Sequence, residues 1–215
     1  MFDNTTELVV AVEPENPLHE KAIYWGSSPF GDIGKFPTIS DIYVRSLSEE
    51  PMPLSIFVSA VRNATTRIWI MDEYFFTSGS KKIKTTIHVS NICNWFHKDL
   101  MATDIRILTG SHSEVTADDL SLVRMQAEDI NRSKPKRQTN CKIDIKTNLT
   151  SEDLNFIHDR FAIVDNELWH FGGTVGGYQK NVSAVSRGWC ALETGAIEFF
   201  RLVWIKAGGS SDDVA

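Results

Sequence analysis

Three side chains that could act together on a phosphate group lie within one short segment of the sequence. The segment is His158-Asp159-Arg160-Phe161-Ala162-Ile163-Val164-Asp165. Its apolar half reads as a strand, in which residues two apart share a face, so His158 and Arg160 project together while the alternate residues point into a core. An imidazole beside a planar guanidinium suits a group that carries charge on its non-bridging oxygens. We expect Asp165, at the strand's end, to approach an imidazole nitrogen and fix its tautomer.

A glycine-rich segment follows at a fixed distance. Gly172-Gly173-Thr174-Val175 begins six residues after Asp165. The whole pattern resembles the signature of the phospholipase D superfamily, which is His-x-Lys, four residues, Asp, six residues, then Gly-Ser-x-Asn. The sequence departs from that signature in two places. Arg160 replaces lysine, which keeps the charge and adds a bidentate fork, and Gly-Gly-Thr-Val removes the serine hydroxyl and the asparagine amide.

The resemblance implies a phosphodiesterase that needs neither a metal nor a cofactor and acts through a phosphohistidine on His158. It implies that Arg160, Gly172, Gly173 and Thr174 bind the phosphate, the glycines through backbone amides. A nucleic-acid or nucleotide phosphodiester is favoured over a lipid, because no membrane-binding amphipathic element is evident. The alternative is a phospholipase D-like module that has kept the anion pocket within a larger system and has lost turnover.

The motif occurs once in the chain, which matters for assembly. The resemblance extends to superfamily members that form a homodimer, in which one histidine attacks phosphorus and the other protonates the leaving oxygen. We therefore expect a two-fold homodimer with the loop 172–178 at or near its interface.

The elements around the motif alternate between strands and helices. Continuous apolar runs predict buried strands at 67–71, 104–108 and 161–164, and alternation predicts another at 141–145. Residues 165–167 predict the turn of a hairpin to 168–171, with a further strand at 189–192. Helices are expected from residue 53, over 90–100, over 116–130 and from 196. These elements predict an α/β fold with a mixed sheet, and the resemblance makes it a phospholipase D-like αβα sandwich over residues 51–206.

The two ends of the chain read differently from this middle part. Residues 1–50 predict an extension of short strands and loops, including a strand at 41–45, and residues 207–215 predict a disordered tail. Of the chain's net charge of -6, the first fifty residues contribute nine acidic and three basic side chains. That balance argues against broad adhesion to nucleic acid or anionic membranes, although a local basic site is compatible with it.

Composition excludes several other classes of protein. The chain has 215 residues, 42% hydrophobic and 23% charged, as in soluble globular proteins. No window of about 18 apolar residues predicts a membrane span and no basic, apolar leader begins the chain, so a cytoplasmic protein is expected. Three widely spaced cysteines predict neither a disulfide framework nor a zinc site.

Other charged residues are open to two interpretations. The basic run 132–137 and the lysines at 81, 82 and 84 could contact nucleic acid, but solvated loops are favoured. Asp72 and Glu73, which end a predicted strand, could bind a metal or repel a second anion, and solvated carboxylates are again favoured.

Overall fold

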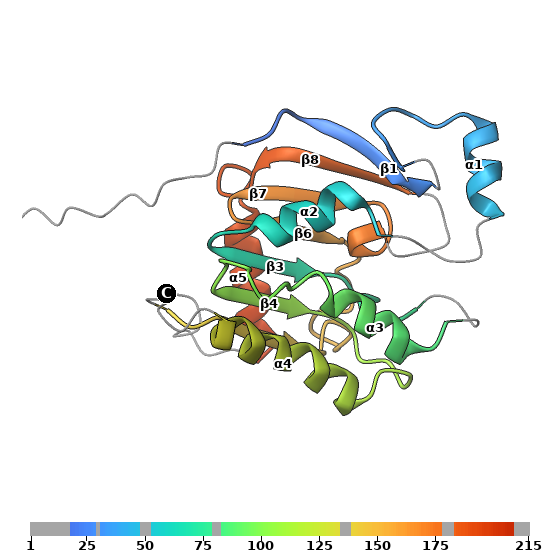
Figure 1. Ribbon diagram of the computed structural model, residues 1–215. Coiled ribbons are helices and arrows are strands. Elements are labelled where there is room, and N and C mark those ends of the chain that lie inside the picture. Colours follow the sequence, from blue (N-terminus) through green and yellow to red (C-terminus); the bar gives the residue numbers. More distant parts are fainter. Residues whose placement is uncertain are drawn as a thin grey trace, which may run out of the picture.

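The structure is a computed structural model that describes residues 18–28, 31–47, 53–78, 83–133, 139–177 and 183–208. The predicted mixed α/β fold is confirmed (Figure 1). The strands are β1 (Ala22–Ser28), β2 (Gly31–Ile33), β3 (Arg67–Met71), β4 (Asp104–Leu108), β5 (Lys142–Lys146), β6 (Phe161–Val164), β7 (Glu167–Phe171) and β8 (Ala184–Cys190). The α-helices are α1 (Ile39–Ser46), α2 (Ser55–Asn63), α3 (Thr85–Cys93), α4 (Ala117–Ser133) and α5 (Ala196–Lys206).

All the strands belong to one sheet, in the order β2-β1-β8-β7-β6-β3-β4-β5. Strands β3, β4 and β5 are parallel, and α3 and α4 form the crossovers between them. The remaining neighbours pair antiparallel, starting with β6 against β3. The length of each connection decides whether two strands pair in parallel or antiparallel. The two-residue turn between β6 and β7 can only reverse the chain direction, whereas the helical crossovers after β3 and β4 allow the next strand to run in parallel.

Helices cover both faces of the sheet (Figure 1). Ile68 and Ile70 of β3 pack in the cluster with α2, α3 and α4, whereas Trp69 and Met71 pack with α5. Neighbouring residues therefore enter different cores, which is why β3 reads as a continuous apolar run. Among the described residues, no helix is long and apolar enough to cross a bilayer.

The predicted N-terminal extension, residues 1–50, contributes to the main sheet. Strand β1 pairs with β8, with Ala22 opposite Arg187, so part of the expected extension lies within the main sheet. The strand expected at 41–45 is wrong, because this segment is in α1. Thr38 and Asp41 cap that helix: the Thr38 N–H donates to Asp41 Oδ2 at 2.8 Å and the Asp41 N–H to Thr38 Oγ1 at 3.2 Å.

Three further expectations need correction. The helix expected over 90–100 is α3 at Thr85–Cys93, and Trp95 and Phe96 pack beyond its end. The strand expected at 189–192 is β8, which ends at Cys190. Ala207 is buried beside α5, so the predicted tail cannot begin there. Several predicted features lie outside the described residues. They are most of the predicted tail (209–215), most of the basic run (134–138), the first 17 residues, and Lys81 and Lys82, within the segment 79–82.

Candidate active site

One edge of the sheet gathers the ends of several strands around the predicted motif. Met71 is the last residue of β3 and pairs with Leu108, the last of β4, and with Phe161, the first of β6. Asp72 and Arg160 therefore leave their strands opposite each other. The segment that follows β7, starting at Gly172, begins at the same edge. We call this the carboxyl edge, after the ends of β3 and β4.

Asp72 holds Arg160 at this edge. Arg160 Nε lies 3.6 Å from Asp72 Oδ1, and its guanidinium lies 5.3 Å from the centre of the Tyr74 ring. The Arg160 side chain is 29% exposed, whereas that of Asp72 is fully buried. The Arg160 carbonyl also accepts the Phe171 N–H, which fixes the backbone. The guanidinium is thus positioned by an ion pair and an aromatic face, and part of it stays open to solvent.

Asp72 is a buried carboxylate, not the solvated one that was favoured from the sequence. Its Oδ1 accepts the Tyr74 N–H at 2.9 Å and its Oδ2 accepts the Val175 N–H at 2.8 Å. Burial raises the pKa of Asp72 to about 6. The two hydrogen bonds and the charge of Arg160 act in the opposite direction, but burial has the larger effect. The side chain therefore ties β3, the Arg160 segment and the loop after β7 together. Both oxygens of Asp72 are thus engaged within the chain, by Arg160 and by two backbone N–H groups, which opposes the metal-binding and anion-repelling roles considered for it.

His158 lies just before β6 and is exposed. Among the described residues its ring has no hydrogen-bond or ion-pair partner. The expectation that His158 and Arg160 lie on the strand is wrong, because β6 begins at Phe161, and all four residues of β6 are buried. The structure thus brings His158 and Arg160 to the same edge and leaves the imidazole accessible.

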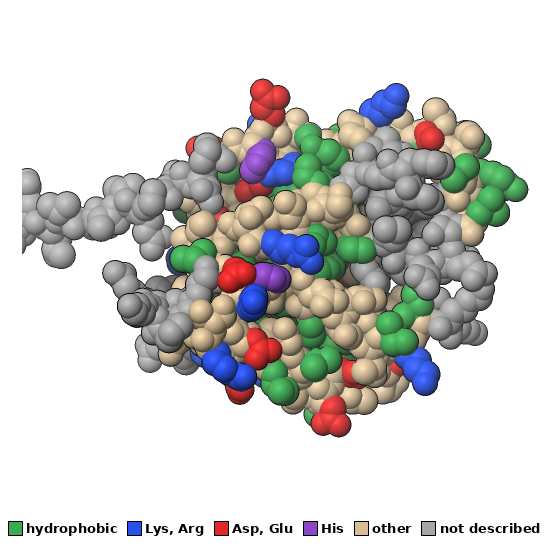
Figure 2. All heavy atoms as spheres, viewed as in Figure 1, with side chains coloured by type: hydrophobic (Ala, Val, Ile, Leu, Met, Phe, Trp, Pro, Cys, Tyr) green, Lys and Arg blue, Asp and Glu red, His purple; other side chains and the backbone are tan. Residues whose placement is uncertain are grey.

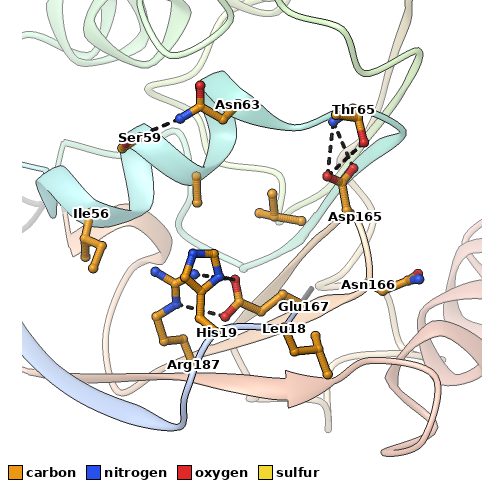
Figure 3. A pocket seen from close by; sticks show the side chains of 12 residues that line it. Leu18, His19, Ile56, Ser59, Asn63, Thr65, Asp165, Asn166, Glu167 and Arg187 are labelled. Carbon is orange, nitrogen blue, oxygen red and sulfur yellow. Dashed lines mark hydrogen bonds and ion pairs between the residues drawn. The ribbon is translucent and has the colours of Figure 1, made fainter. Parts of the chain in front are cut away.

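Asp165 does not join them. It lies beyond the other end of β6, where Oδ1 accepts the Thr65 N–H at 3.0 Å (Figure 3) and the Thr66 N–H at 2.7 Å. Asp165 adopts a positive φ of 55°, which the turn into β7 requires. The prediction that Asp165 orients an imidazole is therefore wrong for His158 of this chain. Its carboxylate instead caps the amino end of β3.

A different carboxylate contacts a different imidazole. His170 Nε2 of β7 lies 2.6 Å from Asp159 Oδ1, and both side chains are about half exposed. A pocket of about 360 Å³ adjoins them, with Phe161, Leu168 and Phe199 on its apolar side. The sequence did not indicate this pair, because its members are 11 positions apart on a hairpin whose register only the fold defines.

The loop after β7 uses some of its donors within the chain. The Gly172 N–H donates to the Ala184 carbonyl at 2.9 Å, and the Val175 N–H is bound by Asp72. Gly173 and Thr174 are buried. The predicted role of Gly172 as a phosphate ligand is thus opposed by its own hydrogen bond. Tyr178, the predicted end of this loop, lies outside the described residues.

Gly176 explains why this loop needs glycine. Its φ is 86°, and a Cβ there would overlap Cη2 of Trp95. The Gly176 carbonyl also accepts the Leu54 N–H at 2.7 Å. The loop is therefore packed directly onto the core beneath the carboxyl edge.

Tyr74 and His112 extend the site in a way that the sequence did not indicate. Their ring centres lie 5.0 Å apart, and His112 Nε2 donates to the Glu73 carbonyl at 2.9 Å. A hydrogen bond to Glu73 and its charge raise the pKa of Tyr74. The guanidinium of Arg160 and the ring of His112 thus both contact Tyr74. Among the residues that the structure describes, no three His, Cys, Asp or Glu side chains form a group that could hold a metal ion.

A second and larger pocket, of about 630 Å³, lies at the opposite edge of the sheet (Figure 3). Arg187 donates to Glu167 at 2.8 and 2.6 Å beneath it, and both residues are buried. His19 Nδ1 lies 3.5 Å from the same carboxylate. This paired charge stabilises the junction of β7 and β8, and Asp165 of the predicted motif lines the same pocket.

Comparison with known proteins identifies no family. No protein-family model matches the chain, and no curated protein matches it. Among solved structures, the chain is similar to TrmBL2, an archaeal chromatin protein whose structure is described as showing a novel mode of DNA binding. The match has 14% identity and a TM-score of 0.35, and it covers 71% of this chain and 48% of that one. The chain thus spans about half of that protein, and a likeness this weak carries no argument about function.

Proposed function

We propose that this protein is a phospholipase D-like phosphodiesterase, folded as the αβα sandwich of that superfamily, that acts on a nucleic-acid or nucleotide phosphodiester. One observation supports the proposal most: an accessible imidazole, His158, lies two residues from a guanidinium, Arg160, that a buried carboxylate holds at the same edge. The spacing of the motif supports it independently. A positioned cation beside a free nucleophile is what phosphoryl transfer requires of a protein.

In the proposed reaction a ring nitrogen of His158 attacks phosphorus. A P–N bond forms, the P–O bond to the leaving alcohol breaks, and a proton from a second imidazole converts the leaving alkoxide to the alcohol. Water then attacks phosphorus, the second imidazole accepts its proton, and the P–N bond breaks to release a phosphomonoester and free His158. Arg160 binds the non-bridging oxygens throughout.

The second imidazole in this proposal is His158 of another copy, since the motif occurs once. The arrangement requires a two-fold homodimer that brings the two carboxyl edges together. Two Arg160 side chains would repel each other there, and a bound phosphate would reduce the repulsion. Sedimentation at micromolar protein should show a dimer that phosphate strengthens; a strict monomer with and without phosphate would contradict the two-histidine mechanism.

A binding module without turnover is the second candidate, and three observations favour it. Arg160 is already paired with Asp72, the Gly172 amide is engaged, and Asp165 is remote from His158. Such a module would take an anion at the carboxyl edge in competition with Asp72. It would do so without making or breaking a bond to phosphorus.

Hydrolysis of bis(4-nitrophenyl) phosphate separates the two candidates. The enzyme should release nitrophenol continuously with and without a chelator, and His158→Ala should abolish the release. Arg160→Gln should weaken it, whereas Arg132→Gln, on the exposed face of α4, should not. Stoichiometric phosphate binding by the wild type with no turnover would contradict the enzyme and support the module.

A further inference from the structure

The sheet face beneath α5 carries a group of basic side chains that the predicted motif does not include. Each row across the parallel strands joins one residue of β3, one of β4 and one of β5. The rows are Arg67–Asp104–Lys142, Trp69–Arg106–Asp144 and Met71–Leu108–Lys146. Trp69, Met71 and Leu108 pack against α5, and residues two apart on a strand share a face. The charged members of these rows therefore lie on the α5 side of β3, β4 and β5.

Three arginines surround Trp69 on this face. The guanidinium carbons of Arg67, Arg106 and Arg201 lie 5.2, 5.0 and 5.8 Å from the centre of its ring. Arg201 comes from α5, so the cluster joins the helix to the sheet. Lys146 adds a fourth cation, 4.3 Å from the centre of the Trp204 ring.

The carboxylates on this face are fewer than the cations. Asp104 is bound by Arg106 Nε at 2.8 Å and by Trp69 Nε1 at 2.9 Å, and Asp144 is bound by Lys142 at 2.8 Å. Within the described part of the chain, neither Arg67 nor Arg201 forms an ion pair. Glu198, one helical turn before Arg201, forms none with it. This excess of positive charge raises the local electrostatic potential and attracts anions, although the chain as a whole has a net charge of -6.

The arginines also have hydrogen-bonding capacity that the described residues do not use. Arg106 is 9% exposed, and its Nη1 atom is buried without a hydrogen-bond partner, as is the Nε atom of Arg201. Stacking on Trp69 and Trp204 offsets part of the cost of burying Arg106. The remaining donors of Arg67 and Arg201 are only partly buried and can reach a ligand.

We propose that this basic patch, defined as Arg67, Arg106, Lys142, Lys146 and Arg201, binds the phosphate backbone of a nucleic acid. Three neighbouring strands span about 10 Å, which is wider than a single phosphate group. Planar guanidinium donors suit phosphate oxygens, and contacts of this kind fix the backbone without reading sequence. Arg67 lies at the opposite end of β3 from Asp72, about 15 Å along the strand, whereas Lys146 lies level with Met71 and Leu108, two strands away from β3.

The opposite face of the molecule provides a contrast. Figure 2 shows positive and negative side chains interspersed over the face formed by α2, α3 and α4. On α4, Arg132 lies 3.5 Å from Asp129 and 3.9 Å from Glu128 and is 73% exposed. It offers a matched control, because its removal subtracts one exposed positive charge from a neutralised surface.

The experiment measures binding of fluorescein-labelled 20-nucleotide single strands and 20-base-pair duplexes by anisotropy, in the full chain. The double variant Arg67→Gln/Arg201→Gln should raise the Kd at least tenfold. Its plot of log K against log salt should flatten by about 0.7 to 0.9 per lost phosphate contact. The charge-preserving pair Arg67→Lys/Arg201→Lys should retain most of the affinity, which separates loss of charge from loss of folding.

One control makes the result specific. Arg132→Gln should change the Kd less than twofold, because it removes a positive charge that Asp129 and Glu128 already neutralise. Equal Kd values for the wild type and the Gln double variant, or no binding by the wild type at 50 mM salt, would overturn the proposal. Full competition by millimolar inorganic phosphate would identify a single-anion site and would also overturn it.

Discussion

Replacing Asp72 by asparagine should remove a specific dependence of stability on pH. In the folded chain, burial raises the pKa of Asp72 to about 6 from its ordinary value of 3.8. The folded state thus binds this proton more tightly than the unfolded state does. The resulting stabilisation is fully present below about pH 4 and is lost as the pH rises through about 6. A shift of about two pKa units corresponds to about 3 kcal/mol.

The assay is urea unfolding, followed by tryptophan fluorescence, of the wild type and Asp72→Asn between pH 4 and 7. Phosphate-free buffers keep anions away from Arg160. The free energy of unfolding of the wild type minus that of the variant should fall by about 2 kcal/mol over this range, because asparagine does not titrate and the unfolded wild type is already partly ionised at pH 4. Asp153→Asn is the matched control: Asp153 is 68% exposed beside Lys206, so its difference should be nearly flat.

A difference for Asp72→Asn that stays constant with pH would refute the reasoning. A difference that rises with pH would show that Arg160 and the two backbone N–H groups outweigh burial. In that case Asp72 would be a carboxylate stabilised in its ionised form.

Two other changes should act on stability. Asp165→Ala should lower the free energy of unfolding by about 2 to 4 kcal/mol, because it leaves the Thr65 and Thr66 N–H groups without their acceptor. Phosphate binding per folded molecule, measured by calorimetry, should not change. Weaker phosphate binding with unchanged stability would contradict the structural role of Asp165. Gly176→Ala should lower the free energy of unfolding, measured by thermal denaturation, by more than 2 kcal/mol, because the new Cβ would meet Trp95. The control is Gly195→Ala, where φ is 75° and no atom lies within 4 Å of the new Cβ, and it should lower the free energy of unfolding by about 1 kcal/mol. Equal losses would refute the packing argument.

The sequence predicted best where local pattern and burial agree. β3 and β4 were predicted with their observed bounds, because strands buried on both faces read as continuous apolar runs. The prediction was wrong at residues 41–45, where a helix cap opposes strand propensity. The apolar and β-branched residues after Thr38 favour a strand, but the reciprocal hydrogen bonds between Thr38 and Asp41 start a helix.

Long-range pairing accounts for the other failures. The contact of Asp165 with Thr65 joins residues 100 apart, and no local signal marks it. Asp72 could be placed at a strand end from the sequence, but its burial against Arg160 follows only from the antiparallel register of β3 and β6. The same limit hid the basic patch, whose members come from three strands and a helix.

The most direct test of the proposed function is to trap the covalent intermediate. The protein would be mixed with bis(4-nitrophenyl) phosphate in the presence of a chelator, quenched with base within a turnover, and digested for mass spectrometry. The account predicts a peptide with a nitrophenyl-phosphoryl group on His158 that is absent from His158→Ala. Sustained release of nitrophenol with the group on another residue, or with no adduct under any quench time, would contradict it.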